Sequence, residues 1–176
     1  FSHCRFLSFA SNLILLASGE ADCALVQRDV LHAVAASKTF APLLSDIRLI
    51  SPLFNEEVHL IVRRGGPVKS VQDLQDKRIH VGLSSSGTWW TVQTLLKGWS
   101  IDIRTQRSLA QPALMKVLGG ELDGMFLVGG SPMGLLADLP VAYKEDLVLL
   151  DVRTTNKQYP VAALPKGIYR WTDKGC

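Results

Sequence analysis

The sequence predicts an α/β fold, in which the strands of a sheet alternate along the chain with helices that cover it. Short runs of β-branched and apolar residues are followed repeatedly by segments in which apolar residues recur at helical spacing. Such an alternation implies parallel strands joined by right-handed crossovers. The chain has 176 residues, of which 47% are hydrophobic, so it can bury the core of one domain or of two small lobes.

The N-terminal region is expected to contain two short helices separated by a strand. Its apolar stretch at residues 6–17 resembles a secretory signal, but polar residues interrupt it and it is too short to span a bilayer. We therefore expect a helix over residues 12–18 that ends at Gly19, because glycine readily adopts the conformation of a C-cap. A strand over residues 23–26 and a helix over residues 29–36 should follow.

The middle of the chain is expected to enter the sheet. Residues 47–54 and 58–62 are apolar and have the pattern of extended chain. Gly65-Gly66-Pro67 then breaks the chain, and Ser70 caps a single helical turn that reaches Leu74.

Two strand–helix units come next. A strand over residues 79–82 leads into a helix over residues 88–97, and a strand over residues 101–105 leads into a helix that Ser108 caps and Gly119-Gly120 ends. Each helix carries an apolar stripe that should pack on the sheet. The stripes consist of Val92, Leu95, Leu96 and Trp99 in the first helix and of Leu109, Leu114, Val117 and Leu118 in the second.

The last predicted elements are two strands separated by a short helix. A strand over residues 124–128 meets Gly129-Gly130, Pro132 opens a helix to residue 139, and a final strand covers residues 147–152. In sheets of this kind, ligands bind beyond the carboxyl ends of the strands. The turns at residues 84–88 and 129–130 are therefore expected to line one cleft.

The turn at residues 82–88 is the strongest candidate for a binding site. A helix that starts there leaves its first amides unpaired, and its dipole adds about half a positive charge, so the turn favours an anion. Its sequence does not match a phosphate-binding Walker loop, a dinucleotide-binding fingerprint or a nucleophile elbow, so these three sites are excluded. Two interpretations stay open, namely an anion site and a hydroxyl-rich turn that only caps the helix.

Charge and residue chemistry favour a binding protein over an enzyme. The net charge of +3 is small and scattered, so it does not indicate nucleic-acid binding. The three cysteines are isolated and form no metal-binding pattern. His59 and His80 lie in strand patterns, which favours a structural role, and no histidine accompanies a serine or cysteine nucleophile.

Five segments in order resemble the TAXI family, the extracytoplasmic solute receptors of TRAP transporters. The segments are residues 22–30 (DCALVQRDV), 58–63 (VHLIVR), 70–82 (SVQDLQDKRIHVG), 86–88 (SGT) and 122–130 (LDGMFLVGG). The third segment alone is common among type II periplasmic binding proteins, but the ordered set is specific. The resemblance covers nearly the whole chain.

The resemblance implies a type II periplasmic-binding-protein fold, with two α/β lobes joined by hinge strands and a ligand held between them. Residues 1–62 would form a partial first lobe with the hinge strand, residues 63–155 the second lobe, and residues 156–176 a truncated return toward the first lobe. The first lobe is expected to be incomplete. As such a fragment, the chain is expected to bind its ligand weakly.

The function implied is capture of a small organic anion, either a carboxylate or an amino acid such as glutamate, and its delivery to the membrane subunits of a TRAP-type permease. The receptor would be periplasmic or otherwise extracytoplasmic, with a signal peptide upstream of this chain. It would not itself span the membrane, and it would use no metal, cofactor or nucleic acid.

The resemblance also implies which residues contact the ligand. The turn Ser85-Ser86-Gly87-Thr88 would hold a carboxylate with its amides and hydroxyls, while Gly129 and Gly130 would allow close approach. Asn12 and Gln27 would supply polar contacts from the first lobe, although both could instead cap helices. Phe54 at the hinge would pack on the apolar part of the ligand, with a place in the core as its alternative.

Two other function classes remain compatible with this fold, because fold does not fix function. The chain could be the effector-binding domain of a transcription regulator, which would need an attached helix-turn-helix. It could also be the body of a transferase, which would need acidic metal ligands or a cofactor-bearing residue in the cleft.

Overall fold

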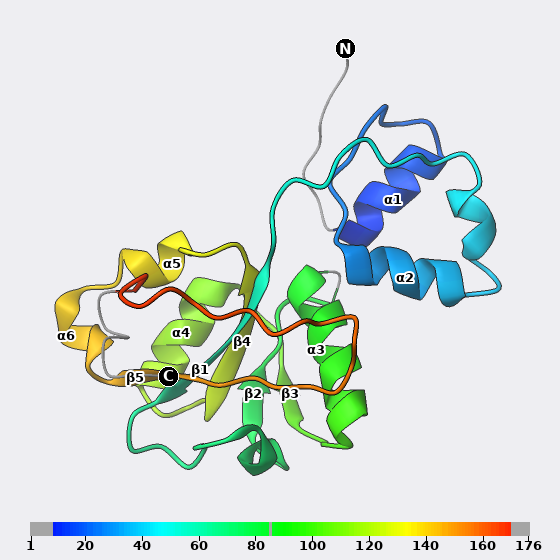
Figure 1. Cartoon of the computed structure of the whole chain (residues 1–176). Helices are drawn as coiled ribbons and strands as arrows, with labels where there is room; N and C mark the ends of the chain where they lie inside the picture. The colour runs from blue at the N-terminus through cyan, green and yellow to red at the C-terminus, as the bar shows by residue number, and fades with distance from the viewer. Residues whose placement is uncertain (1–8, 85, 170–176) are drawn as a thin grey trace.

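The computed structural model describes residues 9–84 and 86–169, and its central feature is a five-stranded sheet with strand order β3-β2-β4-β1-β5 (Figure 1). We call residues 57–150 the sheet unit. The strands of the sheet are β1 (Glu57–Arg63), β2 (Arg78–His80), β3 (Arg104–Gln106), β4 (Gly124–Gly129) and β5 (Leu147–Leu150).

The sheet is mixed, so the expectation of an all-parallel sheet is wrong for one strand. Strand β2 runs parallel to β3 and β4, whereas β1 is antiparallel to both of its neighbours, β4 and β5. The loop from β1 to β2 contains only the single turn η2 (Val71–Leu74), and the two strands are not neighbours in the sheet. No crossover helix therefore constrains β1 to run parallel.

The sheet separates two apolar cores, because side chains alternate between its faces. Phe126 of β4 lies in the core beneath helix α3 (Gly87–Trp99), and its neighbours Met125 and Leu127 lie in the core beneath helix α4 (Ala110–Leu118). The short helices α5 (Gly134–Ala137) and α6 (Val141–Lys144) come between β4 and β5. Burial on both faces explains why β4 and β5 are nearly continuous apolar runs, whereas the edge strand β3 is polar and exposed.

Residues 9–46 form what we call the helical segment, which contains α1 (Phe9–Ala17), α2 (Arg28–Ala36) and the turn η1 (Ala41–Leu44). The expected helices are confirmed, and Gly19 follows the first of them with a φ of +74°. The strand expected over residues 23–26 is wrong, since this stretch pairs with no strand among the described residues. The side-chain amide of Asn12 donates instead to the main-chain carbonyl of Leu25, at 2.9 Å.

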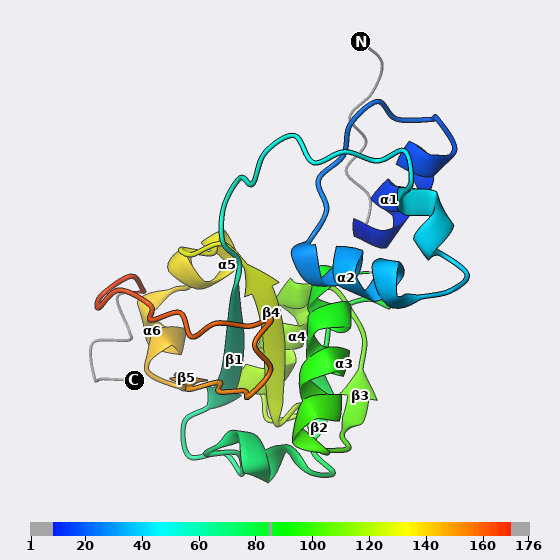
Figure 2. The same ribbon diagram turned by 45° about the vertical axis from the view of Figure 1, so that its right-hand side comes forward.

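One irregular segment, which we call the connecting segment, joins the helical segment to the sheet unit, and a second irregular segment follows β5 (Figures 1 and 2). Residues 47–56 run from the helical segment to β1 without regular structure. Four apolar side chains are exposed there, namely Leu49, Ile50, Leu53 and Phe54. We call residues 151–169 the return segment. It passes Asp29 of α2 at Tyr159 and ends at Tyr169, which is buried in the core beneath α4.

Several element boundaries differ from those expected. Strand β3 begins at Arg104, and helix α5 is only one turn long. Leu109 rather than Ser108 takes the N-cap position of α4, so its side chain is exposed instead of facing the core. The described helices include none long and apolar enough to cross a membrane.

Candidate functional site

The N-terminus of α3 has the geometry of a capped helix. The Ser86 hydroxyl accepts a hydrogen bond from the amide of Trp89 at 3.2 Å and donates one to the carbonyl of Leu83 at 2.8 Å. Gly82 has a φ of +79°, and a Cβ there would lie 2.4 Å from the Ser86 Oγ, so a side chain would displace the cap. The expected Ser85 contact lies outside the described residues.

The next two residues join α3 to the sheet. Gly87 is buried, and the Thr88 hydroxyl accepts a hydrogen bond from the amide of Val128 in β4 at 3.1 Å. Both positions belong to the first turn, whose amides have no partner within the helix. The hydroxyls of Ser86 and Thr88 and the amide of Trp89 are thus used by the fold, so the expected anion contact would fall to the main-chain amides of Gly87 and Thr88.

The structure brings the other expected sheet-side residues to the same edge. Gly129 and Gly130 end β4, and a Cβ on Gly130 would lie 3.5 Å from the ring of Phe54. A Cβ on Gly129 would lie 3.0 Å from the Met133 side chain. Phe54 itself is 68% exposed, so a place in the core is excluded for it.

The two expected contacts from the helical segment lie in different places. Asn12 is buried within that segment, where its side-chain amide donates to the carbonyl of Leu25. Gln27 is 8% exposed, and its side-chain amide donates to the carboxylate of Glu56, just before β1. It occupies the N-cap position of α2 but makes no side-chain capping bond, so the capping interpretation of Gln27 is wrong.

Three parts of the chain meet at Asp29 through hydrogen bonds. Its carboxylate accepts hydrogen bonds from the Thr91 hydroxyl of α3 at 2.5 Å and from the Tyr159 hydroxyl of the return segment at 3.0 Å. Its other oxygen accepts from the amide of Val30 at 2.8 Å, at the start of α2. Burial, followed by the Asp29 charge, raises the pKa of Tyr159, which keeps that phenol protonated.

We refer to one group of residues as the interface site. They come from the start of α2, from α3, from the connecting segment and from the return segment, and they are Gln27, Asp29, Glu56, Thr91 and Tyr159. Burial raises the pKa of Glu56; the hydrogen bond from Gln27 opposes this, and the charges of Asp29 and Glu57 reinforce it. The site is therefore rich in carboxylates.

Sequence reasoning identified only Gln27 of this group as a ligand contact. The acidic pair Glu56-Glu57 directly before β1 was a signal that could have been used. The spacing of Gly87 and Thr91, four residues apart, also places Thr91 on the same face of the helix as Gly87. Tyr159 lies in an irregular segment and offers no local signal.

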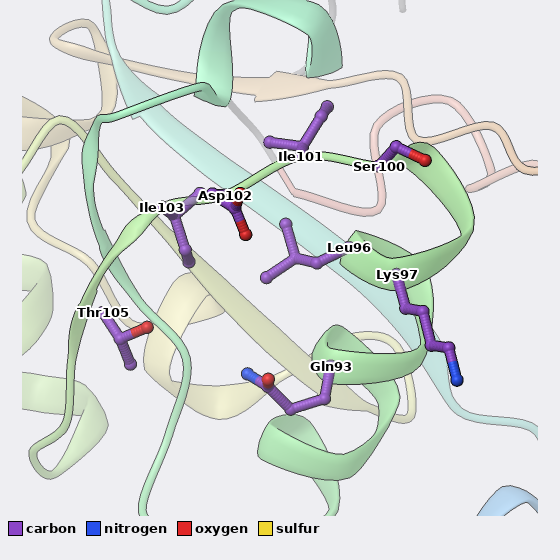
Figure 3. Close-up of a pocket in the computed structure, with 8 residues that line it drawn as sticks. All are labelled: Gln93, Leu96, Lys97, Ser100, Ile101, Asp102, Ile103 and Thr105. Carbon is purple, nitrogen blue, oxygen red and sulfur yellow. The ribbon is translucent and has the colours of Figure 1, made fainter.

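Two hollows among the described residues lie away from these residues. One, of about 460 Å³, lies between the C-terminal half of α3 and the chain leading into β3 (Figure 3). Gln93 and Lys97 line it from α3, and Asp102 and Thr105 line it from the opposite side. A second, of about 180 Å³, lies beside Ser70 and Arg153. Neither includes a residue expected to bind the ligand.

Both histidines of the strands are buried, as expected. His59 shares its Nε2 with the Tyr169 hydroxyl at 2.9 Å and the Ser131 hydroxyl at 3.2 Å, while its Nδ1 lies 3.1 Å from the carbonyl of Glu57. His80 accepts from the amide of Gly82 at 3.2 Å. Burial lowers the pKa of both imidazoles, which fits structural roles within the sheet unit.

Comparison with known proteins gives a family and a fold. The sequence pattern of the NMT1-like family matches residues 9–174. Among solved structures, a periplasmic binding protein from Brucella ovis with glutathione bound matches 83% of this chain and 43% of its own, with 14% identity and a TM-score of 0.56. A substrate-binding protein of an amino acid ABC transporter matches 96% of this chain and 69% of its own, with 16% identity and a TM-score of 0.53.

A third structure extends the comparison to a bound amino acid. It is an amino acid ABC transporter substrate-binding protein from Streptococcus pneumoniae bound to L-arginine, with 19% identity and a TM-score of 0.50. It matches 96% of this chain, which spans 66% of its length. The chain has the type II periplasmic-binding-protein fold over its described residues, and the names of all three similar structures describe binding proteins.

Proposed function

The chain belongs to the NMT1-like family, and on that premise we propose that it is a solute-binding protein that captures a small organic ion between its helical segment and its sheet unit. The observation that supports this proposal is that the hydroxyls of Thr91 and Tyr159 both donate to the carboxylate of Asp29. These contacts bring α2 directly beside the N-terminal half of α3, where main-chain amides favour an anion.

Capture would work through the connecting segment, residues 47–56, together with the contacts at Asp29. A solute that touches both the first turn of α3 and the interface site stabilises the arrangement in which the two regions meet, by its differential affinity for that arrangement. Phe54 and Gly130 lie where the connecting segment reaches the sheet, so they would follow the same motion. The other expected contacts are Ser85, Ser86, Gly87, Thr88 and Gly129 on the sheet side, and Asn12 and Gln27 in the helical segment.

We further propose that the protein is a TAXI-type receptor that works outside the cytoplasm and delivers its solute to a TRAP-type permease. The five ordered segments from residue 22 to residue 130 support this assignment. The gene is then expected beside genes for TRAP-type membrane subunits. Genes for an ABC-type permease in that place, or a DNA-binding domain on the same chain, would contradict it.

A thermal-shift screen of amino acids and small carboxylates tests solute binding. A ligand at one hundred times its Kd should stabilise the protein by about 2.7 kcal/mol. If none of these solutes raises the Tm, the protein does not act as a receptor for small organic ions.

A substitution at the interface site tests where the solute binds. Gln27→Ala should weaken the binding of the best solute by about tenfold, because it removes a buried polar contact. Gln111→Ala, at an exposed position of α4, is the matched control and should leave the Kd unchanged. Equal Kd values for the two variants would place the solute elsewhere.

A further inference from the structure

Strand β3 is an edge strand, and one of its two sides is open. Among the described strands, only β2 pairs with it. The amide of Arg104 donates to the carbonyl of Lys77, and the carbonyl of Gln106 accepts from the amide of Val81. Because main-chain groups alternate in direction along a strand, the N–H and C=O of Thr105, between these two residues, point away from the sheet. The strand is exposed along its whole length, so a further strand has room to add there.

A hollow of about 460 Å³ adjoins this open edge on the side of α3 (Figure 3). Ile103 and Thr105 line it from the sheet, and Gln93 and Leu96 line it from the helix. The side chains of Gln93 and Leu96 point across the hollow toward the chain of β3. Since successive side chains of a strand point to opposite faces, a chain paired with β3 would direct every second side chain toward this hollow.

The edge carries more positive than negative charge. Arg104 lies in β3, Arg107 directly follows the strand, and Lys97 lines the hollow from α3. None of these three cations belongs to either ion pair found among the described residues. The carboxylate that lines the hollow is that of Asp102. A second copy of β3 would bring like charges together, whereas an acidic chain would be attracted.

From the open edge, the adjoining hollow and the unpaired cations, we propose that β3 is a docking site for an extended acidic segment of another protein, which adds to the sheet as a further strand. Main-chain hydrogen bonds to Thr105 provide the pairing, and side chains directed at the hollow and at the arginines provide the selectivity. The site lies at the C-terminal half of α3, away from Gly87 in its first turn, so it does not depend on the proposed solute.

Two peptides of opposite charge test the selectivity. The probes are capped peptides of alternating glutamate and valine and of alternating lysine and valine, and their binding to the full chain is measured by fluorescence anisotropy. The Kd should be at least about tenfold lower for the glutamate peptide. An equal or lower Kd for the lysine peptide would overturn the acidic preference, and no binding of the glutamate peptide would overturn the docking site.

A proline at the edge tests whether the peptide pairs with the strand. Thr105→Pro removes the outward N–H but leaves the bonds of Arg104 and Gln106 to the neighbouring strand intact. It should weaken binding of the glutamate peptide about tenfold or more, while Thr105→Val, which keeps the N–H, should not. Melting curves verify the folding of both variants. Equal Kd values in the two variants would mean that charge alone attracts the peptide, which contradicts strand addition.

A charge reversal gives a second test that leaves the main chain unchanged. Arg107→Glu should weaken the glutamate peptide and strengthen the lysine peptide, each about fivefold or more. Lys166→Glu, at an exposed position of the return segment, is the matched control and should change neither Kd. Equal effects of the two variants would overturn the role of Arg107.

Sedimentation of the chain alone tests the other occupant of this edge. We expect no dimer that depends on β3. A dimer that Thr105→Pro abolishes would show that a second copy occupies the edge, and would overturn the assignment to an acidic partner.

Discussion

The sheet unit and the helical segment differ in the interactions that stabilise each of them. The sheet unit buries two apolar cores, one on each face of its sheet, with ten or more buried side chains in each. Among the side chains described in the helical segment, Leu13 and Val30 are the buried apolar ones, and Asn12 and Gln27 are buried beside them. Its described hydrogen bonds to the rest of the protein are those of Gln27 and Asp29, together with a contact of 3.2 Å between His32 Nδ1 and Gln158 Nε2.

This difference suits a receptor that closes on its ligand. Apolar burial gives the sheet unit a stable frame, since each fully buried large side chain contributes roughly 1.5–3 kcal/mol. Hydrogen bonds contribute less net stability and can be exchanged for bonds to water or to a ligand. A region joined by hydrogen bonds can therefore separate from the frame at low cost.

The largest effect is expected in the sheet unit. Phe126→Ala removes a fully buried ring that stacks near Trp99, with ring centroids 6.5 Å apart, and should lower the free energy of unfolding by about 3–5 kcal/mol. Urea denaturation followed by tryptophan fluorescence measures it. Phe54→Ala, at an exposed ring of the connecting segment, should change it by less than about 0.5 kcal/mol. Similar losses in both variants would break the comparison.

A smaller and local effect is expected where the two regions meet. Asp29→Ala removes the acceptor of the Thr91 and Tyr159 hydroxyls, and should lower the free energy of opening of α2 by about 2 kcal/mol. Hydrogen exchange should accelerate in α2 and remain unchanged in β4. The control Asp22→Ala, at an exposed position of the same segment, should change neither. Faster exchange in β4 would show that the two regions unfold together.

The cap of α3 should matter within the sheet unit. Ser86→Ala removes the hydroxyl that binds the amide of Trp89, and should cost about 1 kcal/mol in the free energy of unfolding. Ser84→Ala, at an exposed position of the same turn, is the control for urea denaturation. Equal stability of the two variants would mean that the Ser86 hydroxyl does not stabilise the helix.

The smallest expected effect is the change of Tm with pH, which depends on histidines of the sheet unit. Burial lowers the pKa of His59 and His80 in the sheet unit, so below the ordinary histidine pKa of about 6.5 the unfolded chain binds protons that the native chain does not. The Tm should therefore fall as the pH is lowered from 7 to 5. His80→Gln should reduce this fall, and a Tm that is constant or higher at pH 5 would contradict it.

Acid should act in the opposite sense on Glu56. Burial raises the pKa of Glu56, so the native state binds a proton more readily than the unfolded chain does. The free energy of unfolding therefore gains a contribution from Glu56 as the pH falls through the raised pKa toward the ordinary value of 4.5. Exchange of α2 amides should accordingly slow relative to that of β4 amides as the pH is lowered, after correction for intrinsic rates.

The sheet unit was largely predictable from sequence, because its alternation of strands and helices is local. The antiparallel direction of β1 was not, since it depends on which strands become neighbours rather than on the residues of β1 itself. The turn at Ser86 and the glycines at the end of β4 lie at one edge of the sheet, where the Thr88 hydroxyl accepts from the amide of Val128, and that they line one ligand cleft stays a prediction.

The interface site was much less predictable. Asp29 lies 62 residues from Thr91 and 130 from Tyr159 in sequence, so their contacts arise only from the tertiary fold. The strand expected over residues 23–26 failed for a related reason, because a strand needs a neighbour and apolar pattern alone does not supply one.

Hydrogen–deuterium exchange with and without a saturating amino acid tests most directly whether the solute lies between the two regions. We expect slower exchange both in the first turns of α3, around Gly87 and Thr91, and at the start of α2, around Asp29 and Val30. Slower exchange in only one of these regions, or around the hollow at Lys97 and Thr105, would contradict binding between the helical segment and the sheet unit.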